Sequence, residues 1–227
     1  MIKAVIFDLD GVICSTDRYH YQAWKQLADE LGVFFNEEIN NRLKGVSRME
    51  SLDIILEKSN KEYSIEEKQV LATKKNNIYR SLLQNMNDKD LSSDVLKTLY
   101  LLKRKDIKVA IGSSSKNAMY ILERIGLDNS FDVVIDGMQI SKSKPNPEVF
   151  LLAAEKLNLM PKDCAVVEDA KTGIDAANAG GFISIGMNDA GNYGKSEYRI
   201  KKVSDIVNII NEYNMLHVTK NITYRQI

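Results

Sequence analysis

The stretch Ile2-Lys3-Ala4-Val5-Ile6-Phe7-Asp8-Leu9-Asp10-Gly11 contains the first regular structure that the sequence predicts. A short run of mainly apolar side chains ends abruptly at two carboxylates and a glycine, which is typical of a buried strand that gives way to a polar loop. Similar runs recur at residues 107–111, 131–135, 164–167 and 182–185. Each of these runs is also predicted to be a buried strand.

Helical patterns separate the later predicted strands. They cover residues 95–104, 117–125, 148–157 and 172–179; glycines end two of them, and Pro147 opens a third. Strands that alternate with helices form βαβ units, and such units build a parallel sheet covered by helices. The sequence therefore predicts an α/β fold with a parallel-sheet core.

The segment between the first two predicted strands, residues 16–90, contains no strand-like run. Apolar side chains recur at helical spacing along residues 16–31, and Ser64-Ile65-Glu66-Glu67 has the pattern that starts a long helix. An insertion of this length exceeds a simple crossover connection. We predict an all-helical, four-helix domain at residues 16–90, inserted into a core domain made of residues 1–15 and 91–227.

The composition limits the possible functions. The chain has 227 residues, 44% of them hydrophobic, and its 31 Lys and Arg balance its 31 Asp and Glu. The hydrophobic fraction argues against disorder, and the balance of charges argues against a globally basic protein that binds nucleic acid or an anionic membrane. Two distant cysteines without a histidine cluster argue against a disulfide framework or a zinc site. With neither a signal-peptide pattern nor an apolar run long enough for a membrane span, we predict a cytoplasmic protein.

Carboxylates follow two of the predicted strands directly. Asp8 and Asp10 come after the first strand, and Glu168 and Asp169 come after the strand at residues 164–167. The carboxyl ends of parallel strands meet at one edge of a sheet, where open α/β sheets bind their ligands. Carboxylates crowded there repel one another unless a cation neutralises them. A few oxygen ligands, completed by water and phosphate, indicate Mg²⁺.

Ser113 and Lys144 supply the groups that a phosphate needs opposite such a metal. Ser113 lies where a strand gives way to a helix, whose N-terminal amides favour an anion, and Lys144 adds a positive charge. Ser113 alone would be interpreted as a helix N-cap. Together with the carboxylates, these residues predict a phosphoryl-transfer site with a carboxylate available as nucleophile.

Four short motifs resemble the signatures of the haloacid dehalogenase (HAD) superfamily: Asp8-Leu9-Asp10-Gly11-Val12, Gly112-Ser113, Lys144-Pro145 and Glu168-Asp169. The resemblance implies a HAD-like Rossmannoid core, and the inserted helices resemble the four-helix cap of its first subclass. The stretches Leu43-Lys44-Gly45-Val46-Ser47-Arg48 and Ser113-Ser114-Ser115-Lys116-Asn117 are similar to motifs of the β-phosphoglucomutase family. The sequence departs from that family at Ser114, where a smaller residue is expected, and at Cys14-Ser15, where an acid is common.

The resemblance implies that β-D-glucose 1-phosphate and D-glucose 6-phosphate are interconverted through an aspartyl-phosphate enzyme and β-glucose 1,6-bisphosphate. Asp8 would be the nucleophile, and Asp10 would be the general acid and base towards the sugar hydroxyl. Ser113 and Lys144 would hold the transferring phosphoryl group. Mg²⁺ would be bound by Asp8, the backbone carbonyl of Asp10, Asp169 and, directly or one contact away, Glu168.

Further residues would position Asp10 or bind a small sugar phosphate. Thr16 lies at the cap's hinge and His20 would help to place Asp10 when the cap closes, although His20 could also be a half-buried packing residue. Arg48 and Lys116 would hold the second phosphate. Lys75 is either a sugar contact or a solvated lysine. The other predicted substrate contacts are Trp24, Lys44, Gly45, Val46, Ser47, Ser51, Ser114, Ser115 and Asn117.

Other functions are compatible with the same scaffold. A sugar-phosphate or phosphoglycolate-type phosphatase would use identical core chemistry with water as the acceptor, but it has less need of two phosphate-binding sets. A dehalogenase or phosphonate hydrolase would not need Asp10, and a catalytically inactive binding protein would not need the complete acidic set. We expect a monomer. Cys14 is interpreted as a packing residue or an oxidation-sensitive one, and the tail after about Met215 as a surface strand, a helix end or a frayed terminus.

Overall fold

The computed structural model describes residues 1–43, 46–91 and 94–223, with side chains up to residue 217. Within these residues a six-stranded sheet has the strand order β3-β2-β1-β4-β5-β6, and every neighbouring pair is parallel. The strands are β1 (Ala4–Phe7), β2 (Lys108–Gly112), β3 (Val133–Ile135), β4 (Cys164–Glu168), β5 (Ile183–Gly186) and β6 (Tyr198–Arg199). The predicted parallel α/β core is confirmed. β6 was not predicted, because two residues are too few to show a periodic pattern.

Side chains on alternate positions of β1 enter two different hydrophobic clusters. Ala4 and Ile6 lie in the cluster that α7 and α8 cover, whereas Val5 and Phe7 lie in the cluster that α5, α6 and α10 cover. This alternation is the two-residue period of a strand buried on both faces. The covering helices are α5 (Val95–Lys103), α6 (Ala118–Arg124), α7 (Glu148–Lys156), α8 (Lys171–Ala179) and α10 (Ile206–Thr223), and a short α9 (Asn188–Gly191) follows β5.

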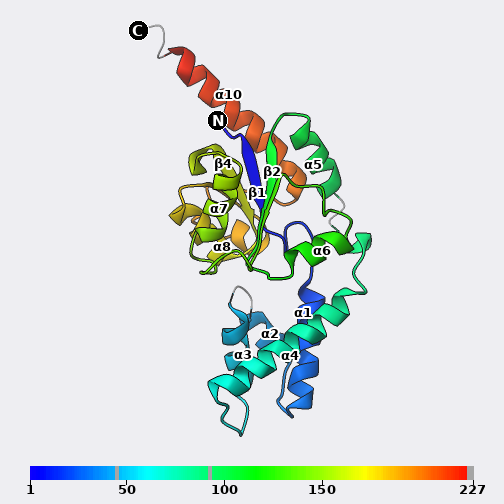
Figure 1. Cartoon of the computed structure of the whole chain (residues 1–227). Helices are drawn as coiled ribbons and strands as arrows, with labels where there is room; N and C mark the ends of the chain where they lie inside the picture. The colour runs from blue at the N-terminus through cyan, green and yellow to red at the C-terminus, as the bar shows by residue number, and fades with distance from the viewer. Residues whose placement is uncertain (44–45, 92–93, 224–227) are drawn as a thin grey trace.

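Of the helices described between β1 and β2, the first four form a group beyond the carboxyl end of β1 (Figure 1), and α5 follows them along the chain. The four are α1 (Asp17–Glu30), α2 (Glu37–Arg42), α3 (Arg48–Leu56) and α4 (Ile65–Leu83). As predicted, Ser64 starts α4: its hydroxyl accepts a hydrogen bond from the backbone N–H of Glu67, whose carboxylate accepts one from the backbone N–H of Ser64. Among the described residues between positions 16 and 90, the regular structure is therefore helical, as expected.

The helical segment has a hydrophobic cluster of its own, but the last turns of α4 pack into the hydrophobic core of the sheet. Trp24, Leu27 and Leu52 belong to the helices' own cluster. By contrast, Tyr79 and Leu83 of α4 lie in the cluster that α5, α6 and α10 cover. The boundary between a core at residues 1–15 and 91–227 and a cap at residues 16–90 stays a prediction.

Three short 3-10 helices connect longer elements: the first follows α4, the second precedes β4 and the third precedes α10. These short helices are η1 (Asp88–Asp90), η2 (Pro161–Asp163) and η3 (Val203–Asp205). Ile206 and Ile210, one turn apart, bury the first part of α10 in the core, and the helix then extends away from the sheet (Figure 1). Of the three alternatives for the tail after Met215, a helix end is correct up to Thr223.

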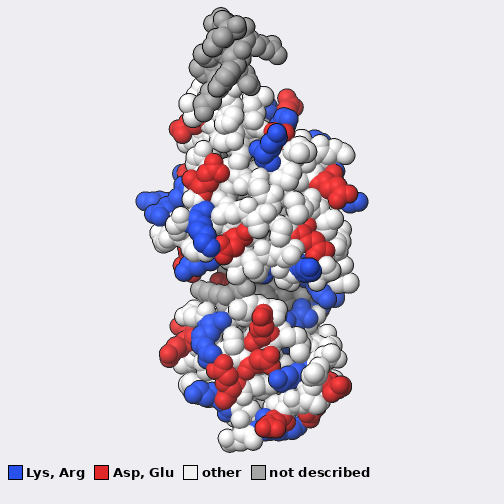
Figure 2. All heavy atoms as spheres, turned by 90° about the vertical axis from the view of Figure 1, so that its left-hand side faces the viewer, with Lys and Arg blue, Asp and Glu red and all other residues white. Residues whose placement is uncertain are grey.

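The surface carries charges of both signs. Figure 2 shows Lys and Arg intermingled with Asp and Glu over the core and over the helical segment, with a waist between the two. No helix in the described part of the chain has the length and apolar character that a membrane span requires.

Candidate active site

Three carboxylates meet where β1 and β4 end. The two strands are neighbours and pair Phe7 with Val167, so that Asp8 and Glu168 lie side by side at the same edge. Carboxylate oxygens of Asp8, Glu168 and Asp169, one from each residue, all lie within 4.8 Å of one another. The predicted gathering of carboxylates at this edge is thus present.

Lys144 lies between two of these carboxylates. Its Nζ donates to Oδ1 of Asp8 and to Oε1 of Glu168, at 2.5 Å in each case. The lysine side chain is 9% exposed, so it is a buried cation. Burial acts to lower the pKa of Lys144, but the two carboxylates outweigh it and raise that pKa above the ordinary value. Lys144 therefore brings a permanent positive charge to the nucleophile position that the sequence predicted.

One lysine does not neutralise this cluster. Burial, followed by repulsion from Asp8 and Glu168, raises the pKa of Asp169 to about 8. Burial also raises the pKa of Glu168 to about 7, against the attraction of Lys144. Both shifts mean that a further cation is favourable, and oxygen ligands suit Mg²⁺. The residues fit this ion, and Asp8, Glu168 and Asp169 are the side chains that would hold it.

Gly11 lies against this cluster and has no room for a side chain. Its φ angle is +79°, and a Cβ atom there would lie 1.9 Å from Oδ2 of Asp169. Only glycine fits both the backbone conformation and the space. The glycine after Asp10 therefore lets the loop pass directly over the predicted metal ligand.

Asp10 lies outside the group of three carboxylates. Its Oδ1 accepts a hydrogen bond from the hydroxyl of Thr16, a fully buried residue that immediately precedes α1. Burial, with repulsion from Asp8, raises the pKa of Asp10 to about 7. A carboxyl group with this pKa can both donate and accept a proton near neutrality. The predicted metal contact through its backbone carbonyl stays a prediction.

Lys75 of α4 is buried, so the interpretation as a solvated lysine is wrong. It is 2% exposed, and its Nζ lies 2.7 Å from Nδ1 of His20 and 4.6 Å from the ring centre of Trp24. Burial, followed by the charges of Lys75 and Arg48, holds the pKa of His20 well below its ordinary value, so its neutral ring can accept from Lys75. Tyr79, which the sequence analysis did not select, stacks on His20 one helical turn after Lys75.

The burial of Lys75 leads to a testable pH dependence of stability. Burial, followed by the charge of Arg48, lowers the pKa of Lys75 from 10.5 to about 7. Between these two values the unfolded chain binds a proton that the folded protein does not, so stability increases as the pH rises. In urea titrations, we would compare the free energies of unfolding of the unmodified protein and of Lys75→Met. Above about pH 7, the difference between them should change by about 1 kcal/mol per pH unit in favour of the unmodified protein.

The control for this measurement is Lys74→Met. Lys74 is the preceding residue on α4, but its side chain is 52% exposed and pairs with Glu30 at the surface. The stability of this variant should change with pH in parallel with that of the unmodified protein above about pH 7. Parallel stability curves for Lys75→Met and the unmodified protein would contradict a lowered pKa for Lys75.

In the loop after β2, two serine hydroxyl groups accept hydrogen bonds from backbone N–H groups of the same loop. The backbone N–H of Ser115 donates to Oγ of Ser113, and the backbone N–H of Asn117 donates to Oγ of Ser115. Asn117 precedes α6, so the alternative of Ser113 as its N-cap is wrong. The side-chain amide of Asn117 donates to Oδ1 of Asn76 in α4, at 3.1 Å. Asn76 links the helical segment to the core and was not among the predicted site residues.

Arg48 begins α3 and is half-buried. Its charge acts on the pKa of both His20 and Lys75, which places it on the same side of the helical segment. No carboxylate in the described part of the chain forms an ion pair with Arg48. Burial lowers its pKa, so an anion there would be stabilising.

For the remaining predicted residues that it describes, the structure shows location and exposure but no hydrogen bond to the carboxylates of the site. Lys44 and Gly45 lie outside the described residues. Ser47 caps α3 by accepting from the backbone N–H of Glu50, and Ser51 is buried in the same helix. Cys14 is buried, and burial raises the pKa of its thiol, which favours the packing interpretation. The others differ in exposure: Val46 and Lys116 are exposed and Ser114 is half-buried.

Comparisons with known proteins agree with this geometry. A family model described as haloacid dehalogenase-like hydrolase matches residues 2–181. The chain belongs to this family. Within the family, the chain is 39% identical over 207 residues to a protein of Bacillus subtilis named beta-phosphoglucomutase, covering 90% of this chain and 92% of that protein. It is 32% identical over 220 residues to a phosphorylated carbohydrates phosphatase of Thermotoga maritima, covering 93% and 99% of the two chains.

Solved structures of the family resemble this fold as well. The crystal structure of a beta-phosphoglucomutase from Clostridium difficile superposes with a TM-score of 0.86 at 40% sequence identity, covering 96% of this chain and all of that one. The haloacid dehalogenase-like fold, with a helical group between β1 and β2, therefore extends over nearly the whole chain.

Proposed function

We propose that the protein interconverts β-D-glucose 1-phosphate and D-glucose 6-phosphate, with β-glucose 1,6-bisphosphate as the intermediate. The observation that carries this proposal is the contact between Thr16 and Asp10. A sugar hydroxyl needs an acid and base beside the phosphorylated carboxylate, and here that group is held by the first residue of the helical segment. The similarity to the Bacillus subtilis and Clostridium difficile proteins supports the same activity.

In the proposed reaction, an oxygen of Asp8 attacks the phosphorus of the bisphosphate, and the bond from phosphorus to the sugar oxygen breaks. Asp10 gives its proton to that leaving oxygen. In the second half, a hydroxyl of the sugar monophosphate gives its proton to Asp10 and attacks the phosphorus on Asp8. The bond from that phosphorus to Asp8 breaks, which releases the free Asp8 carboxylate. Lys144, 2.5 Å from Asp8, neutralises charge on the transferring group. Bound Mg²⁺ would supply further neutralisation from Asp8, Glu168 and Asp169.

The second phosphate of the substrate would bind on the opposite side of the site. Arg48 has no carboxylate partner among the described residues, and Ser115 and Asn117 present polar groups at the end of β2. Binding this phosphate would connect the helical segment to the core. A single-phosphate hydrolase has less use for such a second set, which favours transfer to a sugar.

Several features of the protein's setting remain part of the proposal. The partner is a small sugar phosphate, and bound Mg²⁺ with trace glucose 1,6-bisphosphate would be required for turnover. We also propose a monomer in the cytoplasm that binds neither nucleic acid nor membrane. The alternative is a sugar-phosphate phosphatase, which the similarity to the Thermotoga maritima protein favours.

A product assay distinguishes the two functions. The protein is incubated with Mg²⁺, β-glucose 1-phosphate and a trace of glucose 1,6-bisphosphate, and glucose 6-phosphate and free phosphate are measured separately. We expect glucose 6-phosphate as the main product, and no product from the α anomer. Free phosphate as the main product would refute the proposed transfer and support the phosphatase.

A further inference from the structure

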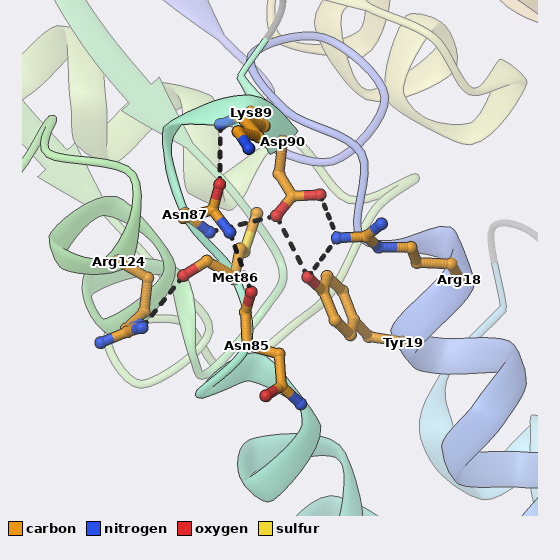
Figure 3. A network of polar contacts seen from close by, with 8 residues as sticks. All are labelled: Arg18, Tyr19, Asn85, Met86, Asn87, Lys89, Asp90 and Arg124. Atoms are coloured by element: carbon orange, nitrogen blue, oxygen red, sulfur yellow. Dashed lines mark hydrogen bonds and ion pairs between the residues drawn. The ribbon is translucent and has the colours of Figure 1, made fainter.

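Asp90 is the centre of a polar network where the helical segment rejoins the core. Its Oδ1 accepts from the guanidinium of Arg18 at 2.5 Å, and its Oδ2 accepts from the hydroxyl of Tyr19 at 3.1 Å. The backbone N–H of Asn87 also donates to Oδ2. Figure 3 shows the side chains of Arg18 and Tyr19 converging on Asp90 from α1. One carboxylate thus connects the chain that leaves the core to the chain that returns to it.

This network is more enclosed than an ordinary surface ion pair. The side chain of Asp90 is 8% exposed and Tyr19 is 3% exposed, although Arg18 remains largely exposed. The guanidinium of Arg18 also donates to the hydroxyl of Tyr19 at 2.5 Å. Exposed ion pairs contribute little to stability, whereas a buried carboxylate that accepts three hydrogen bonds holds its partners in a defined position. The first turn of α1 is therefore held by η1.

The returning chain is itself held by the core on its other side. A guanidinium nitrogen of Arg124, at the end of α6, donates to the carbonyl oxygens of Gln84 and Met86, at 2.6 and 3.0 Å. Figure 3 shows the contact with Met86. The side chain of Asn87 accepts from the backbone N–H of Lys89 within the same turn. Asp90 is thus fixed relative to the sheet.

The network is connected to Asp10 through a short backbone path. The backbone N–H of Tyr19 donates to the carbonyl oxygen of Thr16, whose hydroxyl donates to Asp10. Cys14, in the loop after Asp10, forms isolated bridges with both Asp10 and Leu91. Movement of the first turn of α1 therefore changes the distance between the Thr16 hydroxyl and Asp10.

We propose that Asp90 is a positioning residue for the transfer step: by fixing Arg18 and Tyr19, it holds Thr16 against Asp10. This inference rests on the proposed function. Asp90 touches no reacting atom and acts only through Thr16. Its loss should misplace Asp10 in both halves of the reaction, so that phosphorylation of Asp8 and transfer to the sugar both become slower. More of the phosphoryl groups on Asp8 would then be lost to water.

The test compares Asp90→Ala with Asp88→Ala. Asp88 lies in the same short helix, but its side chain is exposed and outside the network. For each protein we would measure the kcat for glucose 6-phosphate formation, the KM for β-glucose 1-phosphate, and the fraction of phosphoryl groups released as free phosphate. We expect Asp90→Ala to lower kcat by about tenfold or more with a small change in KM, and to raise the released fraction. Asp88→Ala should match the unmodified protein.

Asp90→Asn keeps the inference testable if Asp90→Ala folds poorly. Asparagine retains one acceptor oxygen but loses the ion pair with Arg18, so this variant should show an intermediate released fraction. An unchanged kcat and released fraction in the folded Asp90 variants would overturn the positioning role while leaving the proposed function intact. If the unmodified protein forms no glucose 6-phosphate, the proposed function fails and the positioning role fails with it.

Discussion

Asp8→Asn is expected to abolish phosphorylation of the protein and to lower formation of glucose 6-phosphate by roughly ten-thousand-fold or more. Asp8 is the carboxylate that Lys144 contacts at the end of β1, and asparagine offers no nucleophilic oxygen of comparable strength. The substitution preserves side-chain shape, and Lys144 keeps its contact with Glu168, so the fold should survive. Incubation with radiolabelled glucose 1,6-bisphosphate, followed by denaturation, measures the label on the protein.

Asp136→Asn is the matched control for this prediction. Asp136 directly follows β3 at the same edge of the sheet, and it is 9% exposed, comparable with 8% for Asp8. Its carboxylate accepts from the backbone N–H of Met138 within its own loop, a contact that asparagine can keep. The control should therefore be labelled normally. Label retained by Asp8→Asn would show that another residue is the nucleophile.

The core was predictable because its signals are local. The apolar run before Asp8 indicates both a buried strand and its polar end within a few residues. The run at residues 164–167, before Glu168, does the same. Two adjacent strands in a parallel sheet then bring the two ends together without further information. The predicted grouping of Asp8 with Glu168 and Asp169 follows from topology alone.

The contacts of the helical segment were less predictable, because they depend on how helices far apart in sequence pack. Lys75 lies on a helix rich in charged residues, where a solvated lysine is the ordinary expectation. It is buried because His20 of α1 offers a ring nitrogen and Trp24 an aromatic face. Asp90 gave no signal either, since its side-chain partners Arg18 and Tyr19 are more than seventy positions away.

Asp10→Asn is expected to lower transfer to the sugar by about 10²–10⁴-fold, the usual contribution of a general acid and base. Asparagine can still accept the hydrogen bond from Thr16, so the first turn of α1 should stay in place. It cannot exchange a proton, whereas the raised pKa of Asp10, about 7, makes the carboxyl group suited to both directions of transfer. Calorimetric Mg²⁺ binding should be preserved, because the side chain of Asp10 lies outside the cluster of three carboxylates.

The comparison of Asp10→Asn with Asp17→Asn separates proton transfer from a change in local charge. Asp17 is exposed in the first turn of α1, and its charge also contributes to the raised pKa of Asp10. Both substitutions remove one negative charge near Thr16, but only the first removes a group that can carry the proton of the sugar hydroxyl. Asp17→Asn should therefore retain transfer. Equal losses in the two variants would mean that the electrostatic field near Thr16, and not proton transfer by Asp10, controls the reaction.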